Sequence, residues 1–266
     1  MYLKLRNFGL YAVILIFRTP FPALFAQKEF EDAHNRITMF FQKASVSTED
    51  PTQRAAIVEE ANQLPGVVTP LIVNGVLKEL ALDPSVSSDN LTMKIAQGLA
   101  TPNHPMETLQ DADGVVSVVR SQKSKTIAIA FDVITCASCT KSWVGVFDCR
   151  DGIWVVASHL ADPPANDAVH LAQIDSKSED LVLLYGIHWG DAHNRLDVKL
   201  YSVEDGKLLP VWSQIDLIQG TIGIHGNEID LTSWTSFTQP CKEKRQAFRI
   251  VDHQPKLLKT SFAAVK

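Results

Sequence analysis

The chain has 266 residues, of which 45% are hydrophobic and 21% are charged, and its formal net charge at pH 7 is -5. This composition is typical of a soluble globular protein that is long enough to bury a sizeable core. Nucleic acid is excluded as a partner because the largest basic cluster is the short run from Lys242 to Arg245.

The N-terminal residues 1–26 have the pattern of a secretory signal. Lys4 and Arg6 precede the run Phe8–Phe17, which has no charge and no proline, and a small residue, Ala26, follows at a plausible cleavage point. The run is about half as long as a membrane-spanning helix, which needs roughly 20 residues. We therefore expect a cleaved signal peptide and a secreted or periplasmic protein. An uncleaved membrane anchor is the alternative.

The region 27–101 is expected to form short helices. Apolar residues between Phe30 and Ala44 recur at steps of three and four, which predicts a helix with one buried face. Asp50-Pro51 and Thr69-Pro70 each place a capping side chain before a proline, so each predicts a helix start.

Two further signals complete the helical region. Pro65-Gly66 predicts the end of the helix that begins after Asp50, and a last helix is expected over Asn90–Leu99. Four short helices with short connections indicate a small antiparallel bundle. The polar segment 102–112 contains two prolines and is interpreted as a linker.

The region 113–266 changes to a period of two, which is typical of strands. Twelve short runs rich in β-branched and aromatic residues are separated by turn signals. The runs are Val115–Val119, Thr126–Ile134, Trp143–Cys149, Ile153–Leu160, Val169–Ile174, Leu181–Trp189, Leu196–Val203, Leu208–Trp212, Thr221–His225, Glu228–Trp234, Gln246–Val251 and Leu257–Phe262. They predict three units of four strands, at about 113–162, 168–217 and 220–266.

The three units share a local signature that indicates an internal repeat. In each unit an aromatic residue stands four positions before an aspartate, and the offsets between units are 54 and 47 residues. The aspartate and its neighbour fit a tight hairpin turn, which requires positive φ. The pairs are Phe147 and Asp151, Tyr201 and Asp205, and Phe248 and Asp252.

A four-stranded unit repeated about every 50 residues resembles a propeller blade or a similar β-meander. The sequence thus predicts an α+β (mainly β) protein with an N-terminal short-helix bundle followed by about three propeller-blade-like units. Propellers have about four to eight blades. Three arrangements therefore stay open: an unusual closure, a ring completed by dimerisation, and a long twisted sheet or sandwich. The helices are expected to cover an open sheet edge.

The second strand of each unit predicts which unit is terminal. Ile127–Phe131 and Leu181–Tyr185 are apolar at consecutive positions, so both faces of these strands are expected to be buried. Ile229–Thr232 alternates between apolar and polar residues. The third unit is therefore expected to have one solvated face.

If the units are repeats, the connections between their second and third strands meet at one rim. These connections span 135–142, 188–195 and 235–244 and contain several cysteine and histidine residues. Within the second connection, the candidate ligand-binding residues are His188, Trp189, Asp191, His193 and Arg195. An aromatic platform beside charged groups on a rigid scaffold suits a glycan or a peptide. Ordinary surface histidines are the alternative.

The cysteines Cys136, Cys139, Cys149 and Cys241 are an even number in a protein that is expected to be exported, so we interpret them as disulfide candidates. Cys136 pairs with Cys139 or with Cys241 in this interpretation. Cys149 either faces the core or pairs with Cys241. A thiol-redox centre at Cys136 and Cys139, or a zinc site that adds two rim histidines, is the alternative.

The sequence contains no recognised catalytic, nucleotide-binding or metalloprotease motif. We assign no catalytic residue, no cofactor and no metal, and expect an exported, non-catalytic binding or structural module. The alternatives are a secreted hydrolase or carbohydrate-active enzyme that uses the rim, and a thiol-redox or zinc protein. A glycan, a peptide or another envelope protein is the expected partner, and a homodimer through an open sheet edge is a further possibility.

Overall fold

The computed structural model describes residues 21–46, 49–112, 114–121, 124–135, 140–161, 168–174, 181–190, 193–238 and 240–265. Within these residues, four helices precede three four-stranded antiparallel sheets. The helices are α2 (Phe21–Ala44), α3 (Pro51–Leu82), α4 (Ser88–Leu99) and α5 (Leu109–Ala112). The predicted mainly β fold with N-terminal helices is confirmed.

Each of the twelve predicted runs corresponds to one strand. Sheet 1 contains β1 (Val116–Arg120), β2 (Thr126–Ile134), β3 (Thr140–Arg150) and β4 (Ile153–His159). Sheet 2 contains β5 (Ala168–Ile174), β6 (Leu181–Gly190), β7 (His193–Glu204) and β8 (Lys207–Ile218). Sheet 3 contains β9 (Thr221–His225), β10 (Glu228–Trp234), β11 (Lys242–Val251) and β12 (Gln254–Ala264). In every sheet the strand order follows the chain order, so each sheet is a meander.

Helix α3 begins as expected but does not end where the sequence predicts. Asp50 caps it by accepting a hydrogen bond from Thr52 N at 2.9 Å, and Pro51 occupies its first turn. The helix then continues through Pro65 and Pro70 to Leu82. The predicted end at Pro65-Gly66 and the predicted start at Thr69-Pro70 are therefore wrong.

Burial explains why α3 tolerates two interior prolines. Each costs about 3 kcal/mol because it removes a backbone hydrogen bond and crowds the preceding turn. Four side chains spaced four residues apart are fully buried on the same face, and each contributes about 1.5–3 kcal/mol. They are Val68, Ile72, Val76 and Leu80. This continuous stripe packs mainly against α2 and outweighs the cost of the prolines.

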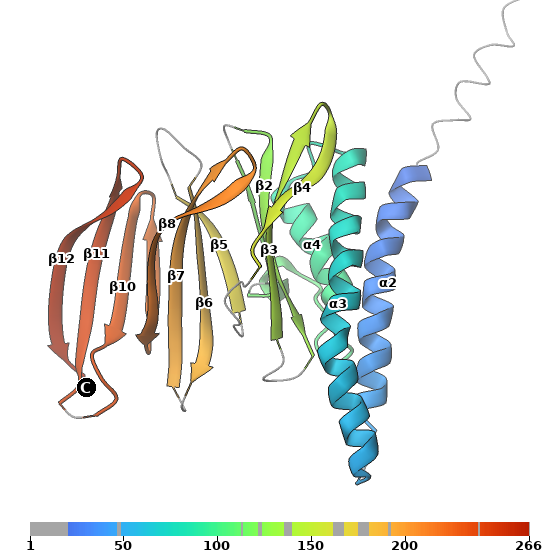
Figure 1. The fold of residues 1–266 in the computed structure, drawn as a ribbon, viewed down its shortest axis with the longest axis horizontal. Helices are drawn as coiled ribbons and strands as arrows, with labels where there is room; N and C mark the ends of the chain where they lie inside the picture. The colour runs from blue at the N-terminus through green and yellow to red at the C-terminus, as the bar shows by residue number, and fades with distance from the viewer. Residues whose placement is uncertain are drawn as a thin grey trace, which may run out of the picture.

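The helices and the three sheets lie in a row of layers, as Figure 1 shows. The first core lies between the helices and one face of sheet 1, where Ile127, Ile129 and Phe131 of β2 are buried. The opposite face of β2 presents Ala128 and Ala130 to a core shared with sheet 2. The predicted burial of both faces of β2 is confirmed.

The inner strand β6 of sheet 2 is buried on both faces as well, as its continuous apolar run predicts. Val182 and Leu184 of β6 face sheet 1, whereas Leu181 and Leu183 join a core shared with Ile229 and other residues of sheet 3. Between sheets 1 and 2, the buried carboxylate of Asp132 accepts hydrogen bonds from Val169 N at 3.0 Å and Ser142 Oγ at 2.6 Å. The hydrogen bond from Val169 N to Asp132 thus joins the two sheets in addition to their apolar contact.

Sheet 3 ends the row with a polar face. Ile229 and Leu231 of β10 are buried, but Asp230 between them is exposed, as the alternating sequence predicts. On the solvated face, Glu228 pairs with Arg249 of β11. The helices cover one face of sheet 1 rather than a sheet edge, which corrects that expectation: α3 contacts β2 and β4, α4 contacts β1, and α2 packs on α3 and α4 as the outer layer. The three stacked sheets form an open row of propeller-blade-like units that does not close into a ring.

The internal repeat is visible in the backbone of all three sheets. The turn between the third and fourth strands has positive φ at both central residues, which are Asp151 and Gly152, Asp205 and Gly206, and Asp252 and His253. Each sheet also has a register shift just before the repeated aromatic residue, which is Phe147, Tyr201 or Phe248. The extra residue always lies in the fourth strand: Ala157, Val211 and Leu258. Turn and bulge recur at the same spacing, which favours a true repeat.

Candidate functional site

The predicted rim lies along one side of the row of sheets, where the second strand of each sheet ends. Strands β2, β6 and β10 all run toward the same end, which is the lower end in Figure 1. The connections that follow these strands contain Cys136, Cys139 and Asp191, which lie outside the described residues. The candidate role of these three residues therefore stays a prediction.

The other predicted ligand-binding residues lie in strands rather than in an eight-residue loop. His188 and Trp189 belong to β6, and His193 and Arg195 belong to β7. In the register of this hairpin, His188 is opposite Arg195 and Trp189 is opposite Asn194. The strands extend further than expected because β6 and β7 stay paired as far as Gly190 and His193.

Arg195 joins sheet 2 to sheet 3. Its Nη1 lies 3.2 Å from Oδ1 of Asp216 in β8, and its guanidinium carbon lies 5.4 Å from the ring centroid of Phe237, between β10 and β11. The Asp216 backbone N–H donates to Asp197 Oδ1 at 2.8 Å. The side chain of Arg195 is 21% exposed. It therefore holds two sheets together at the rim, and its charge has a structural role beside any contact with a ligand.

The described cysteines do not form a disulfide. Cys149 of β3 packs against the core below the helices, as one of the two expectations for it states. Cys241 is buried at the start of β11, and its thiol donates to the Ser236 carbonyl at 3.0 Å. The predicted Cys149–Cys241 pairing is wrong because one cysteine belongs to sheet 1 and the other to sheet 3. Pairing of Cys136 with Cys139 lies outside the described residues.

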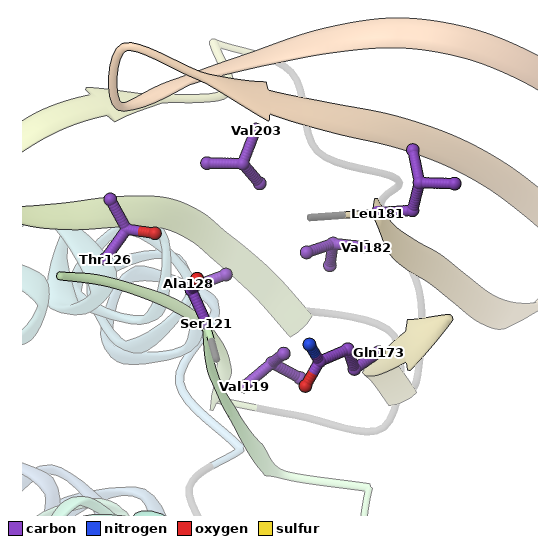
Figure 2. A pocket seen from close by; sticks show the side chains of 8 residues that line it. All are labelled: Val119, Ser121, Thr126, Ala128, Gln173, Leu181, Val182 and Val203. Carbon is purple, nitrogen blue, oxygen red and sulfur yellow. The ribbon is translucent and has the colours of Figure 1, made fainter. Parts of the chain in front are cut away.

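The small cavity in Figure 2 does not serve as a ligand site. It lies between sheets 1 and 2, where Val119 and Ala128 approach Val182 and Val203. Its volume is about 10 Å³, which is room for one water molecule. It is a packing gap in the intersheet core.

A much larger groove lies between α2 and α4, on the helical side of the molecule. Its volume is about 700 Å³, and the segment 100–106 closes one side of it. Phe30 of α2 and Met106 provide an apolar lining, and both are at least 93% buried. The polar lining consists of Gln27, Glu31, His34, Asn35, Glu79, Lys94 and Gln97.

Two glycines fix the position of Phe30. A Cβ atom on Gly75 of α3 would lie 2.9 Å from the Phe30 ring, and one on Gly98 of α4 would lie 3.3 Å from the Phe30 carbonyl oxygen. The absence of these Cβ atoms lets α3 and α4 approach Phe30 of α2 so closely. The apolar lining is thus held by the fold before any ligand arrives.

The polar groups of the groove are partly ordered. Glu79, which is 7% exposed, forms an ion pair with Lys94 of α4. His34 Nδ1 lies 3.0 Å from the Ala100 carbonyl oxygen, to which it donates, and Thr38 Oγ1 lies 3.4 Å from Nε2. These contacts tie α2 to the end of α4 and orient the imidazole at the wall of the groove.

The shifted pKa values of the described residues have structural causes. Hydrogen bonds from Ser85 lower the pKa of Asp83 and hydrogen bonds from Thr108 lower that of Asp111, while burial raises the pKa of Tyr201. Burial also lowers the pKa of Arg120, which donates to the Pro84 and Val86 carbonyls. None of these four groups lines the groove, and the described residues contain no cluster of three potential metal ligands.

Comparisons with protein-family models, curated proteins and solved structures found no match. A function can therefore be inferred from two features, which are the groove and the hairpin of β6 and β7 at the rim, called the rim hairpin below. Among the described helices, α3 is long and apolar enough to cross a membrane, but 44% of its apolar window is buried inside the fold. A core helix of a soluble protein has the same composition.

The groove was missed at the level of sequence although part of its signal is present. Phe30 and His34 are adjacent in the predicted stripe of α2, where a histidine interrupts apolar positions. Glu79 follows in the apolar half of α3, where a charge at a buried position indicates a paired or functional group. The convergence of these residues depends on how three helices pack, which no local pattern specifies.

Proposed function

We propose that the protein is an exported binding module without catalytic activity, and that it holds a small ligand in the groove between α2 and α4. The groove carries this proposal. Its volume of about 700 Å³ lies within the range of about 300–1,000 Å³ that is common for small-molecule sites. Its combination of an apolar floor with a few oriented polar groups is also typical of such sites.

A ligand screen with a groove-filling variant tests this proposal. Gln97 is exposed and lines the groove, so Gln97→Trp should fill the space without disturbing the core. The matched control is Gln63→Trp on the exposed surface of α3, outside the groove. Fragments that give saturation-transfer NMR signals with the wild type should lose them with Gln97→Trp and keep them with Gln63→Trp. Equal binding to both variants, or no binding at all, would contradict the proposal.

Export is supported by the N-terminal pattern of Lys4 and Arg6 before an apolar run. The expected cut after Ala26 falls inside α2, which begins at Phe21, and it leaves Phe30 and His34 of the groove in the mature chain. Mass spectrometry of the extracellular or periplasmic protein should give a mature N-terminus near Gln27. A chain that keeps Met1 and stays with the membrane would favour the uncleaved anchor.

The rim hairpin of sheet 2 is a second candidate site, for a glycan or a peptide. One observation favours it: the side-chain oxygen of Asn194, opposite Trp189, is buried and has no hydrogen-bond partner among the described residues. A buried acceptor without a donor is costly, and a ligand donor would relieve that cost. A glycan and peptide array probed with the wild type and Trp189→Ala tests it. A rim ligand should be lost in Trp189→Ala and retained in Gln97→Trp.

A further inference from the structure

The charges that line the groove are unbalanced. Glu31 of α2 and Glu79 of α3 contribute two carboxylates, and Lys94 of α4 contributes one ammonium group. The remaining polar side chains are amides and one histidine. The two carboxylates and the ammonium group together give the lining a net charge of -1, which favours a cation over an anion.

Glu79 is the acceptor that a ligand would meet. Its side chain is 10% exposed, and only its Oε1 atom has a partner, Lys94 Nζ, among the described residues. A carboxylate accepts about four hydrogen bonds. The second oxygen of Glu79 is therefore available to a donor placed in the groove, in surroundings where water does little to weaken the attraction.

Lys94 does not block this acceptor. Its side chain is 43% exposed, so the fold encloses it only in part. A flexible four-carbon stem lets the group move without disturbing α4. An arriving cation can share Glu79 with Lys94 or replace it.

The apolar side of the groove defines the rest of the ligand. Phe30, Pro105 and Met106 offer a surface without hydrogen-bonding side chains. Each methylene group that is buried there should raise affinity about fourfold. We infer that the groove binds an organic cation, with an ammonium group directed to Glu79 and an apolar chain lying against Phe30 and Met106. This inference rests on the proposed binding function.

Three probes of equal chain length test the ligand class: hexylamine, which is protonated at pH 7, hexanol and hexanoate. Isothermal titration calorimetry with the mature protein, which begins near Gln27 and is otherwise complete, should give at least tenfold tighter binding of hexylamine than of hexanol. Hexanoate should bind more weakly than either. Glu79→Gln should reduce hexylamine to the affinity of hexanol and leave hexanol unchanged.

Lys94→Met provides a variant that does not remove the buried acceptor. It should tighten hexylamine binding severalfold because the competing ammonium group is gone, and weaker binding would overturn the inference. If hexanol or hexanoate binds as tightly as hexylamine, and Gln97→Trp abolishes that binding, the groove is a site but the ligand class is wrong. If none of the three probes binds, both the inferred ligand class and the proposed binding function of the groove fail.

Discussion

Gly206 shows how one residue can serve both a turn and a contact between sheets. Its φ of +75° suits the hairpin between β7 and β8, and a Cβ atom there would lie only 2.6 Å from Cβ of Ala157, the bulge residue of sheet 1. Ser158 Oγ also donates to the Gly206 carbonyl at 2.7 Å. The turn of sheet 2 therefore rests on the bulge of sheet 1.

Gly206→Ala should destabilise the protein much more than Gly152→Ala. Gly152 has a φ of +82° but no atom within 4 Å of an added Cβ, so the cost there is the backbone penalty of about 1–2 kcal/mol. Gly206→Ala adds overpacking against Ala157, worth about 1–3 kcal/mol more. Urea unfolding of both variants measures the difference, and equal losses would contradict the close contact.

Asp83 should make stability depend on pH in the acid range. It follows α3, and Ser85 Oγ and Ser85 N donate to its carboxylate at 2.6 and 2.9 Å. These two bonds, in that order, lower its pKa below 3.8. A lowered pKa gives stability that is present above the unfolded value near 3.8 and is lost as the pH falls through the folded value.

Unfolding of wild type and Asp83→Asn, followed from pH 6 to pH 2, checks this sign. The wild type should be the more stable protein at pH 6, and the difference should shrink as the pH drops below about 3.8. Ser85→Ala removes the main donor and should show a weaker pH dependence than the wild type. A difference that stays constant down to pH 2 would exclude this role for Asp83.

At the scale of elements, the start of α3 was predicted correctly from the sequence, whereas its end was predicted wrongly. The cap at Asp50 was predictable because a local side chain satisfies a local N–H group. The helix end at Pro65-Gly66 was not, because α2 supplies the burial that carries the helix through two prolines. Tertiary packing here overrides a signal that is correct for an isolated segment.

Two glycines of α3 should respond in opposite directions to alanine. Gly66 is exposed and has no atom within 4 Å of an added Cβ, so Gly66→Ala should raise the free energy of unfolding by about 0.5–1 kcal/mol. Gly75→Ala should lower it, because the methyl group would lie 2.9 Å from the Phe30 ring. Thermal and urea unfolding measure both. A stabilising Gly75→Ala would show that Phe30 is not held as tightly as its contacts indicate.

The strands were predictable for a different reason. Their alternating or continuous apolar patterns are local, and the Asp151, Asp205 and Asp252 turns mark their ends. The bulge opposite each repeated aromatic residue has no such signal, because it depends on the register between two strands. The same limit applies to the candidate sites, since the rim follows from strand order but the groove depends on helix packing.

At the scale of the whole molecule, the row of layers has two different ends. The inner strands β2 and β6 of sheets 1 and 2 are buried on both faces, whereas sheet 3 has a core on one face and exposed charges such as Asp230 and Arg249 on the other. In stacked repeats, stability comes largely from the interfaces between neighbours, and a terminal repeat has one interface instead of two. The polar face also makes sheet 3 an unfavourable place to add a further apolar layer.

Sheet 3 should therefore open more easily than the rest of the molecule. In native-state hydrogen exchange, amides of β10 and β11 should show a lower opening free energy than those of β2 and β6. Leu231→Ala removes a side chain that is 2% exposed and should accelerate exchange in sheet 3, with little change in β2. If all three sheets exchange with the same free energy in both proteins, the interfaces are strong enough to unfold the row as one cooperative unit. A gradient from β2 to β11 would show instead that the helices stabilise the end they cover and that sheet 3 folds onto a preformed neighbour.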